Sequence, residues 1–594
     1  MTVNTIALSN CSEDRKHTRL AFAQRITSKH YRLAIKSFGL RIGLFLGLVL
    51  WATQCLMVES ALLVAADPAE LRERHRPNIM IMLIDDMGVM DSSVPFLVDQ
   101  AGKPVRYPLN DWYSTPNMER LAKNGIRFSE FYAMSVCSPS RIALMTGQNS
   151  ARHRTTTWIN PDSNNKGPQG PPDWNWKGLR PENFTLARWM QQAGYRTIHV
   201  GKGHFGPRGS PGADPCNLGF DINVGGSSIG QPGSYYGTKN FGANGPKSTH
   251  PVPGLDAYHG QEIFLTEALT REAKKHVAQS VEDGKPFLLY FPHYAVHAPF
   301  QADPKFPVTE TGPFEAEPAD DRKGVTKKYK DAGTYASLIR GMDDSLGQML
   351  EQFEELGVAE NTLVIFLGDN GSDAPIGGPH EVGSSAPLRG KKGSHYEGGV
   401  RVPFIVSWAK PAETDLQERY KIPSGHIAPD WGAIYDVLPT ISELLEHPLP
   451  KDHVVDGSSL FPKFLHAKST TESSKTVGEL LPNQNSKPSS SDEASGRSFL
   501  MHFPHAPHRS DYFTIFRKGD WKLIYHYFPN PKGQSTHYQL FSLREDPFEQ
   551  KDLAQSHMAQ VKQLVDEMTR ELDDQHALFP VDTDGRIVRP ISPD

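Results

Sequence analysis

Four short apolar runs punctuate the chain, and each has the length of a β-strand. They span Pro77–Ile84, Tyr195–Val200, Phe287–Phe291 and Thr362–Leu367. Uninterrupted apolar runs of this length are typical of strands that are buried on both faces, as in parallel sheets. Each run ends in polar residues, and ligands of open α/β sheets bind at the carboxyl ends of the strands. The pattern therefore predicts a parallel sheet with a polar site along one edge.

Segments with helical periodicity lie between these runs. Apolar residues recur every three to four positions from Tyr335 to Leu356, as they do along one face of a helix. Shorter helices are predicted at Asn117–Asn124 and Thr185–Gln192, and a long one at Gly260–Glu282. Strands that alternate with helices in this way predict an α/β sandwich.

A linker and a small second domain are predicted towards the C-terminus. Residues 469–498 are polar and poor in large apolar side chains, which is typical of a low-complexity linker or insertion. Beyond them lie three strand-like runs and a helix, at Tyr512–Arg517, Trp521–Phe528, Tyr538–Phe541 and Met558–Leu572. We therefore assign residues 67–468 to the large α/β domain and residues 499–594 to a small α+β subdomain.

Residues 1–66 have the composition of an export segment. Lys and Arg are frequent up to Arg41, Ile42–Val58 is almost entirely apolar, and small residues precede Asp67. This order is that of a secretory signal, although the apolar part exceeds the ~7–15 residues of a typical signal core. A cleaved signal and an uncleaved membrane anchor are both compatible with it. Either alternative places the folded domain outside the cytoplasm, in the periplasm or the extracellular space.

Charge and cysteine content exclude several classes of protein. The net charge is −5 and hydrophobic residues make up 38% of the chain, so we expect a soluble globular protein that does not bind nucleic acid. Beyond the export segment, the sequence contains only Cys137 and Cys216, which rules out a disulfide-based scaffold. The sequence assigns no role to Cys216.

The segment around Cys137 carries signals for the start and the end of a helix. Pro139 favours the first turn with Ser138 as the capping residue, and Gly147 suits the left-handed residue that ends a helix. Cys137 would then lie just ahead of unpaired N–H groups, which favour an anion, and Arg141 about one turn later. Taken alone, these residues are also compatible with a buried structural cysteine beside a surface arginine.

The same segment resembles the signature of the type I sulfatases of the alkaline phosphatase-like superfamily. The resemblance is carried by Cys137–Arg141 (CSPSR) and Leu144–Gly147 (LMTG), and further family blocks recur in order from about Pro77 to the Asp-Pro pair at Asp546. It implies a large, mixed, mostly parallel sheet sandwiched by helices. It also implies that a formylglycine-generating enzyme oxidises Cys137 to formylglycine, whose hydrated aldehyde is the nucleophile that attacks a sulfate ester.

Hard oxygen ligands follow two of the predicted strands. Asp85 and Asp86 end the first run, Asp369 and Asn370 end the fourth, and a glycine soon after each pair is expected to let the chain turn tightly. Oxygen-only ligands suit Ca²⁺ or Mg²⁺ rather than zinc, although an Asp pair alone is more often a helix cap or a solvated turn. The sulfatase resemblance implies that these four residues hold one Ca²⁺ ion, with the modified Cys137 also at the metal.

Two basic residues follow the second strand. Lys202 and His204 lie two positions apart and could face the same way, although a solvated basic loop has the same spacing. By the sulfatase resemblance, Lys202 contacts the sulfate and the hydrate, while His204 removes a proton from the hydrate. Family members often have Trp between these positions, and Gly203 is expected only to remove bulk.

Two further positions each have a neighbour that competes for the same role. His297, in the segment AVHAP, resembles the family histidine that protonates the leaving alcohol, while His293 lies nearer the end of the predicted strand. Lys392 matches the second lysine of the family by its distance from Glu397, and the adjacent Lys391 is the less favoured choice. A structural histidine and a solvated basic turn are the alternatives at these positions.

The resemblance implies a two-step hydrolysis. One hydroxyl of the hydrate attacks sulfur to give a covalent sulfated intermediate while His297 protonates the departing alcohol. His204 then takes the proton of the second hydroxyl, and sulfate leaves. Arg141, Lys202, Lys392 and the metal would stabilise charge on the transferring group. The expected substrate is a sulfated carbohydrate or an aryl sulfate.

Two other functions are compatible with the same residues. A phosphodiesterase or phosphonate monoester hydrolase of the same superfamily would use a similar cation, although the full set of basic residues favours sulfate. If Cys137 stays a thiol, the chain could instead be a non-catalytic protein that binds sulfated glycans. In each case the long loops predicted between Gly206 and Pro253 would carry substrate recognition.

Overall fold

The computed structural model describes residues 76–245, 248–307, 323–464, 468–469, 496–505, 509, 511–530 and 535–594, without the side chains of 323–331 and 468–469. The predicted export segment and most of the predicted linker lie outside these ranges. Residues Pro77–Asp594 pack as one unit. Within the described ranges, no helix combines the length and the apolar character needed to cross a membrane.

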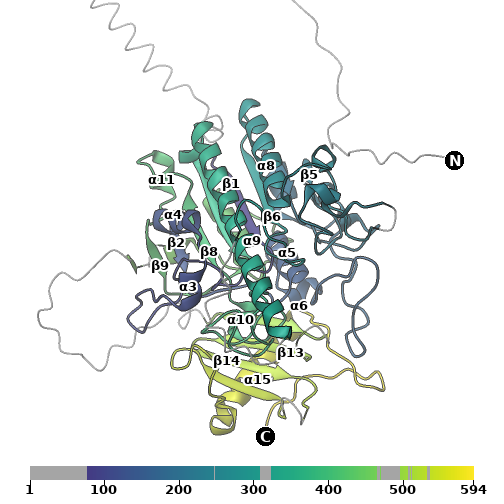
Figure 1. Cartoon of the computed structure of the whole chain (residues 1–594). Coiled ribbons are helices and arrows are strands. Elements are labelled where there is room, and N and C mark those ends of the chain that lie inside the picture. Colours follow the sequence, from purple (N-terminus) through teal and green to yellow (C-terminus); the bar gives the residue numbers. More distant parts are fainter. Residues whose placement is uncertain are drawn as a thin grey trace, which may run out of the picture. The chain divides into compact units, whose positions relative to one another are not determined.

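In this part of the chain, a mixed sheet of nine strands forms the centre of the large domain (Figure 1), in the order β11-β9-β2-β8-β7-β1-β6-β4-β5. The four predicted strands lie side by side within it, as β7 (Thr362–Gly368), β1 (Asn78–Ile84), β6 (Phe287–His293) and β4 (Arg196–Val200). They run parallel to one another. Their carboxyl ends therefore meet along one edge of the sheet, as the sequence predicts.

Shorter strands complete the sheet on both sides. They are β8 (Phe404–Trp408), β2 (Ile126–Phe128), β9 (His426–Ala428), β11 (Lys468–Ser469) and β5 (Ile222–Val224). Strand β8 is antiparallel to both β7 and β2, and β11 is antiparallel to β9, whereas β2 pairs in parallel with β9 and β5 with β4. The sheet is thus mixed and mostly parallel, in agreement with the expected fold.

The central strands separate two hydrophobic cores. Alternate residues of β1 from Ile79 to Leu83 enter one core, and those from Met80 to Ile84 enter the other. The first core includes α5 (Cys137–Thr146), α7 (Leu186–Gln192) and α12 (Val437–Leu444), and the second includes α4 (Pro116–Asn124), α8 (Leu265–Glu282) and α9 (Lys323–Glu355). Figure 1 shows α8 and α9 side by side. Burial on both faces explains why β1, β6 and β7 are mostly apolar.

Three element boundaries differ from the sequence prediction. Helix α8 begins at Leu265, because Gly260 lies in a turn with a left-handed φ of 75°. Helix α9 begins at Lys323, before the apolar periodicity starts, so the periodicity could not predict its first turns. Strand β6 continues beyond Phe291 to His293, because it pairs with β1 as far as Ile84.

A four-stranded antiparallel sheet forms the C-terminal region. Its strands are β12 (Ser498–Phe503), β13 (Phe513–Lys518), β14 (Trp521–His526) and β15 (Tyr538–Ser542), in that order. Helix α15 (Met558–Asp574) packs on β13 and β14. The three predicted strands and the predicted helix are present, and β12 adds an edge strand that the sequence analysis missed.

Candidate active site

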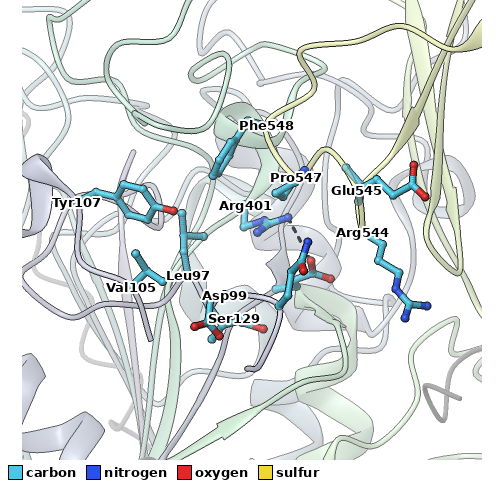
Figure 2. Close-up of a pocket in the computed structure, with 14 residues that line it drawn as sticks. Leu97, Asp99, Val105, Tyr107, Ser129, Arg401, Arg544, Glu545, Pro547 and Phe548 are labelled. Carbon is cyan, nitrogen blue, oxygen red and sulfur yellow. Dashed lines mark hydrogen bonds and ion pairs between the residues drawn. The ribbon is translucent and has the colours of Figure 1, made fainter. Parts of the chain in front are cut away.

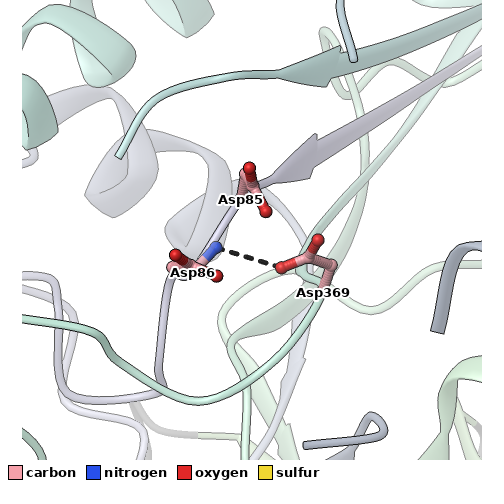
Figure 3. Close-up of side chains that lie close together, drawn as sticks. All are labelled: Asp85, Asp86 and Asp369. Carbon is pink, nitrogen blue, oxygen red and sulfur yellow. Dashed lines mark hydrogen bonds between the residues drawn. The ribbon is translucent and has the colours of Figure 1, made fainter. Parts of the chain in front are cut away.

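Two adjacent parallel strands bring acidic residues together. Strands β1 and β7 pair in register up to Ile84 and Gly368, so the residues that follow share one edge of the sheet. One carboxylate oxygen each of Asp85, Asp86 and Asp369 lies within 4.8 Å of the others, and all three side chains are fully buried. Figure 3 shows the three side chains converging, with the N–H of Asp86 donating to Oδ1 of Asp369 at 3.0 Å.

Three features of this cluster fit a bound metal ion. Its donors are oxygens, as Ca²⁺ and Mg²⁺ prefer. Oδ1 of Asp85 and Oδ1 of Asn370 are buried and accept no hydrogen bond from any described residue, although buried polar atoms are normally paired. Burial and the charge of Asp85 raise the pKa of Asp369 to about 7, a shift that a nearby cation would reverse. Asp85, Asp86, Asp369 and Asn370 would therefore hold a hard divalent cation.

The backbone at this edge is closely packed. Asp86 has a left-handed φ of 65°, which is uncommon for a residue other than glycine and typical of functional sites. A Cβ atom on Gly88 would lie 2.4 Å from the nitrogen of Ser372, and one on Gly371 would lie 2.0 Å from the oxygen of Gly398. Neither glycine has a left-handed φ, but Gly88 begins a turn in which its carbonyl accepts from the N–H of Asp91 at 3.0 Å. Both glycines also permit the close approach of neighbouring backbone segments.

Cys137 is the first residue of α5 and is 4% exposed. The N-cap is Val136, without a side-chain hydrogen bond, so the predicted capping role of Ser138 is wrong. Oγ of Ser138 instead accepts a hydrogen bond from the N–H of Ile159 at 3.1 Å. Gly147 ends the helix with a φ of 67°, as predicted. Residue 137 thus lies in the first helical turn, where backbone N–H groups lack helical partners.

Arg141 points from α5 towards the carboxylate cluster. Its Nε and Nη2 donate to Oδ2 of Asp369 at 3.0 and 2.8 Å, and its Nη1 donates to the carbonyl of Lys202 at 3.0 Å. The side chain is fully buried, so the alternative of a surface arginine is excluded. Burial alone would lower the pKa of Arg141, but the charges of Asp369 and Asp85 raise it above its usual range. Arg141 is therefore a fixed cation beside the acidic residues.

Lys202 and His204 lie at the same place. Nζ of Lys202 donates to Oδ2 of Asp85 at 2.7 Å. Nε2 of His204 lies 2.6 Å from the carbonyl oxygen of Ile159, and its Nδ1 lies 3.4 Å from Sγ of Cys137. Because a carbonyl only accepts, Nε2 carries the proton and Nδ1 presents its lone pair to residue 137. Burial and the charge of Lys202 hold the pKa of His204 well below its usual value, which keeps this proton-accepting form neutral.

The loop after β4 packs against His204. His204 has a left-handed φ of 61°, and its N–H donates to the carbonyl of Ser227 at 2.8 Å. A Cβ atom on Gly203 would lie 2.9 Å from that same carbonyl oxygen. The expectation that Gly203 only removes bulk is therefore incomplete. In this chain the backbone of Ser227 occupies the space that a side chain at position 203 would need. The predicted loop region between Gly206 and Pro253 therefore contributes to the wall of the site.

Of the two candidate histidines, His297 is the one that contacts this cluster. Its Nε2 lies 3.0 Å from Nζ of Lys392 and 3.4 Å from Oδ2 of Asp86, and its Nδ1 lies 2.7 Å from a backbone carbonyl. Burial lowers the pKa of His297 to about 4. His293 is the last residue of β6, and its Nε2 contacts Oγ of Ser345 at 3.0 Å. His293 is thus a buried residue of the helix–sheet interface.

The two adjacent lysines have different partners. Nζ of Lys392 donates to Oδ2 of Asp86 at 2.7 Å. Nζ of Lys391 donates to the carbonyl of Ala374 at 2.7 Å and lies 3.5 Å from Asp373. Burial would lower the pKa of Lys392, but the charge of Asp86 raises it above its usual range. Lys392 therefore adds a third fixed cation to the cluster, as the sequence analysis expected from its spacing.

Two residues from distant segments also reach the site. The sequence analysis named neither of them, although Tyr235 lies in the loop region 206–253 that it expected to carry substrate recognition. The hydroxyl of Tyr235 donates to the carbonyl of His297 at 2.8 Å. Arg509, between β12 and β13, donates to the carbonyl of Lys392 at 3.4 Å. Neither residue follows a predicted strand or belongs to a motif of the resemblance. Only the three-dimensional packing brings them to the site.

A hollow of about 730 Å³ lies apart from these residues (Figure 2). It is lined by the segment from Leu97 to Tyr107 and by the turn from Leu543 to Phe548, with Arg401 among them. Arg401 is held there by Glu397 and, at 3.4 Å, by Glu130. None of the predicted site residues lines this hollow, so we place the active site at the carboxylate edge of the sheet.

Comparisons with known proteins agree with this geometry. The sulfatase family model matches residues 77–447, which include every predicted site residue. The chain belongs to the sulfatase family. Mouse N-acetylgalactosamine-6-sulfatase is 31% identical over 432 residues, which cover 70% of this chain and 70% of the relative. Mouse steryl-sulfatase is 26% identical over 477 residues, which cover 68% of this chain and 67% of the relative.

The fold also matches that of solved structures. The structure of Ps i-CgsB in complex with k-i-k-neocarrahexaose superposes with a TM-score of 0.60 and 23% identity, covering 86% of this chain and 96% of that chain. The expected fold, a mixed and mostly parallel sheet covered by helices with a small antiparallel C-terminal sheet, is thereby confirmed. As a member of the sulfatase family, this chain is an enzyme that hydrolyses sulfate esters.

Proposed function

We propose that this sulfatase removes sulfate from sulfated carbohydrates, with a formylglycine derived from Cys137 as nucleophile and one Ca²⁺ ion at the carboxylate cluster. The observation that carries the proposal is the pairing of Cys137 with His204, whose unprotonated Nδ1 lies 3.4 Å from Sγ. Maturation by a formylglycine-generating enzyme is part of the proposal. So is export by the N-terminal segment, either as a cleaved signal or as an anchor.

The balance of charge supports a singly charged ester as the substrate. The three carboxylates of the cluster, ionised when they ligate a cation, face three buried cations, Arg141, Lys202 and Lys392. These two sets neutralise each other. A divalent cation therefore requires two further negative charges close by, because unpaired buried charge is costly. A sulfate ester supplies one of them, and a deprotonated hydroxyl on residue 137 supplies the other.

Each basic residue has a position suited to one task. Formylglycine, once hydrated, supplies a hydroxyl nucleophile in place of the thiol. His204 accepts a proton from residue 137, because its lone pair faces that side chain. His297 contacts Lys392 and, in its protonated state, delivers a proton to the departing alcohol, so the two histidines occupy different parts of the site, as a base and an acid require. Arg141, Lys202 and Lys392 stay cationic and stabilise the negative charge that grows on the sulfate oxygens.

The names of the similar proteins favour a sugar over a sterol. The relative with 31% identity is named for N-acetylgalactosamine 6-sulfate, and the solved structure holds k-i-k-neocarrahexaose. Steryl-sulfatase is less similar to this chain, at 26%. A phosphonate monoester remains the rival substrate, since it carries the same single charge as a sulfate ester.

Substrate preference is tested with protein co-expressed with a formylglycine-generating enzyme. We would measure kcat/KM for N-acetylgalactosamine 6-sulfate, oestrone sulfate, and the para-nitrophenyl esters of sulfate and phenylphosphonate. The proposal predicts that the sugar sulfate is the best substrate and that the aryl sulfate is cleaved faster than the aryl phosphonate. If the phosphonate ester is cleaved faster than the aryl sulfate, the rival function is favoured. If oestrone sulfate is cleaved faster than the sugar sulfate, the substrate is a sterol sulfate and not a sulfated sugar.

Lys392→Met is expected to lower kcat/KM for para-nitrophenyl sulfate by about 10²–10³-fold, the typical effect of removing one donor aimed at developing charge. Lys391→Met is the matched control, and we expect it to retain activity within about fivefold, because Lys391 contacts a carbonyl and Asp373 but not the carboxylate cluster. The measurement is the initial rate of sulfate release by each purified variant. Similar losses in the two variants would contradict the assignment of Lys392.

Removal of Ca²⁺ is expected to abolish sulfate release and to lower the melting temperature. The reason is that Asp85, Asp86 and Asp369 lie buried within 4.8 Å of one another, and an ion that binds all three in the folded chain stabilises the fold. Re-addition of Ca²⁺ at about a hundred times its Kd should stabilise the fold by about 2.7 kcal/mol. The measurement is activity and thermal unfolding after dialysis against EGTA, with metal content checked by mass spectrometry. Full activity and an unchanged melting temperature in metal-free protein would exclude the site.

A further inference from the structure

Arg509 connects the C-terminal region to the active site through two contacts. Its Nη1 and Nη2 donate to the two carboxylate oxygens of Asp373, the second at 3.1 Å. Its Nη1 also donates to the carbonyl of Lys392 at 3.4 Å. The Asp373–Arg509 pair is thus bidentate, the arrangement that fixes a guanidinium most firmly. These contacts use only part of the donor set of a guanidinium.

This pair lies on the solvent side of the catalytic groups. The Asp86 side chain is fully buried and that of Lys392 is 6% exposed. His297 is 13% exposed, and the pair itself is 10% exposed at Asp373 and 27% at Arg509. The exposed fraction therefore rises from the carboxylate cluster, through Lys392, to Arg509. A substrate whose sulfate sits among the buried cations and that leaves the site on this side passes the pair on its way to solvent.

We propose that the Asp373–Arg509 pair binds hydroxyl groups of the sugar that carries the sulfate. This inference rests on the proposed function. The pair offers acceptors and donors side by side, which match neighbouring hydroxyl groups of a sugar ring and have no counterpart on a sterol or a nitrophenyl ring. The charges of Asp373 and Arg509 balance each other, and the nearby Lys391, 3.5 Å from Asp373, donates to the carbonyl of Ala374. The pair contacts the backbone carbonyl of Lys392, and Nζ of Lys392 contacts His297, so the pair borders the segment that carries this active-site lysine.

Assays with two substrates distinguish binding of the sugar by this pair from positioning of Lys392 by Arg509. Arg509→Met, Arg509→Lys and Asp373→Asn would each be assayed with N-acetylgalactosamine 6-sulfate and with para-nitrophenyl sulfate. We expect kcat/KM for the sugar sulfate to fall by about 10- to 100-fold, because a hydroxyl group of the bound sugar loses its hydrogen-bond partner in the protein. We expect kcat/KM for the aryl ester to stay within about threefold, which also shows that each variant is folded. Arg419→Met, which removes an exposed arginine paired with Glu446, is the matched control and should change neither value.

Each other outcome overturns the inference in a distinct way. Parallel losses on both substrates would mean that Arg509 only positions Lys392. Unchanged turnover of the sugar sulfate would mean that the pair does not touch the substrate. If the wild type cleaves the aryl ester but no sugar sulfate, sugar recognition fails while the sulfatase chemistry stands. If the wild type cleaves neither ester, the proposed function fails, and this inference falls with it.

Discussion

Cys137→Ala abolishes sulfate release, with kcat reduced by at least ~10⁴-fold, the scale of loss seen when a nucleophile is removed. Alanine has no group that can be oxidised to an aldehyde, so no hydroxyl is present beside Nδ1 of His204. The four other residues proposed to hold the metal, Asp85, Asp86, Asp369 and Asn370, and the three cations are untouched by this change. Binding of the ester should therefore persist without turnover, and the variant should protect the fold against heat when a sulfated sugar is added.

Cys216→Ala is the matched control for this experiment. Cys216 lies in a short 3₁₀ helix from Pro215 to Leu218, outside the set of site residues. Both variants are compared with the wild type by sulfate release and by thermal unfolding. The account predicts wild-type activity for the Cys216 variant and none for the Cys137 variant. Sulfate release by Cys137→Ala at the wild-type rate would remove the proposed mechanism altogether.

Lys522→Met destabilises the protein by about 3–5 kcal/mol, because it leaves two buried carboxylates without their shared cation. Nζ of Lys522 lies 2.9 Å from Glu397 and 2.6 Å from Glu549, and all three side chains are at most 1% exposed. Burial, together with the charge of Glu397, raises the pKa of Glu549 to about 7. This contact joins β14 to the start of helix α10 (Glu397–Val400), which follows the segment that carries Lys392. Activity should therefore fall together with stability.

Two further variants keep this prediction testable. Lys518→Met removes a lysine of the neighbouring strand that pairs with Glu567 at a partly exposed position, and it should cost less than about 1 kcal/mol. Adding Glu549→Gln to Lys522→Met should recover part of the lost stability, because an amide of the same shape removes one of the two charges. Calorimetry at a fixed scan rate measures all four proteins. Equal melting temperatures for the Lys518 and Lys522 variants would contradict the buried-network account.

The parts of the fold that could be predicted are those where one local signal dominates. Strands β1, β6 and β7 are mostly apolar because both faces are covered, and polar residues follow each of them and β4. Short strands such as β2 (Ile126–Phe128) have too few residues to carry a period. Their pairing is decided by neighbours distant in sequence, which no local pattern reveals.

The site shows the same division between local and distant signals. The carboxylate cluster follows from two strand ends, and the choices of His297 and Lys392 over their neighbours agree with the contacts observed. The expected cap at Ser138 was wrong because its hydroxyl binds Ile159 instead. Arg509 could not be found at all, because its partner Asp373 is far from it in the sequence.

The central claim is that residue 137 is an aldehyde in the active enzyme. The most direct test is the mass of the tryptic peptide Phe128–Arg141, taken from protein purified from its native source. The account predicts the mass in which the –CH₂SH group of Cys137 is replaced by –CHO, in a fraction that matches the fraction of active enzyme. An unmodified thiol throughout a fully active sample would contradict it.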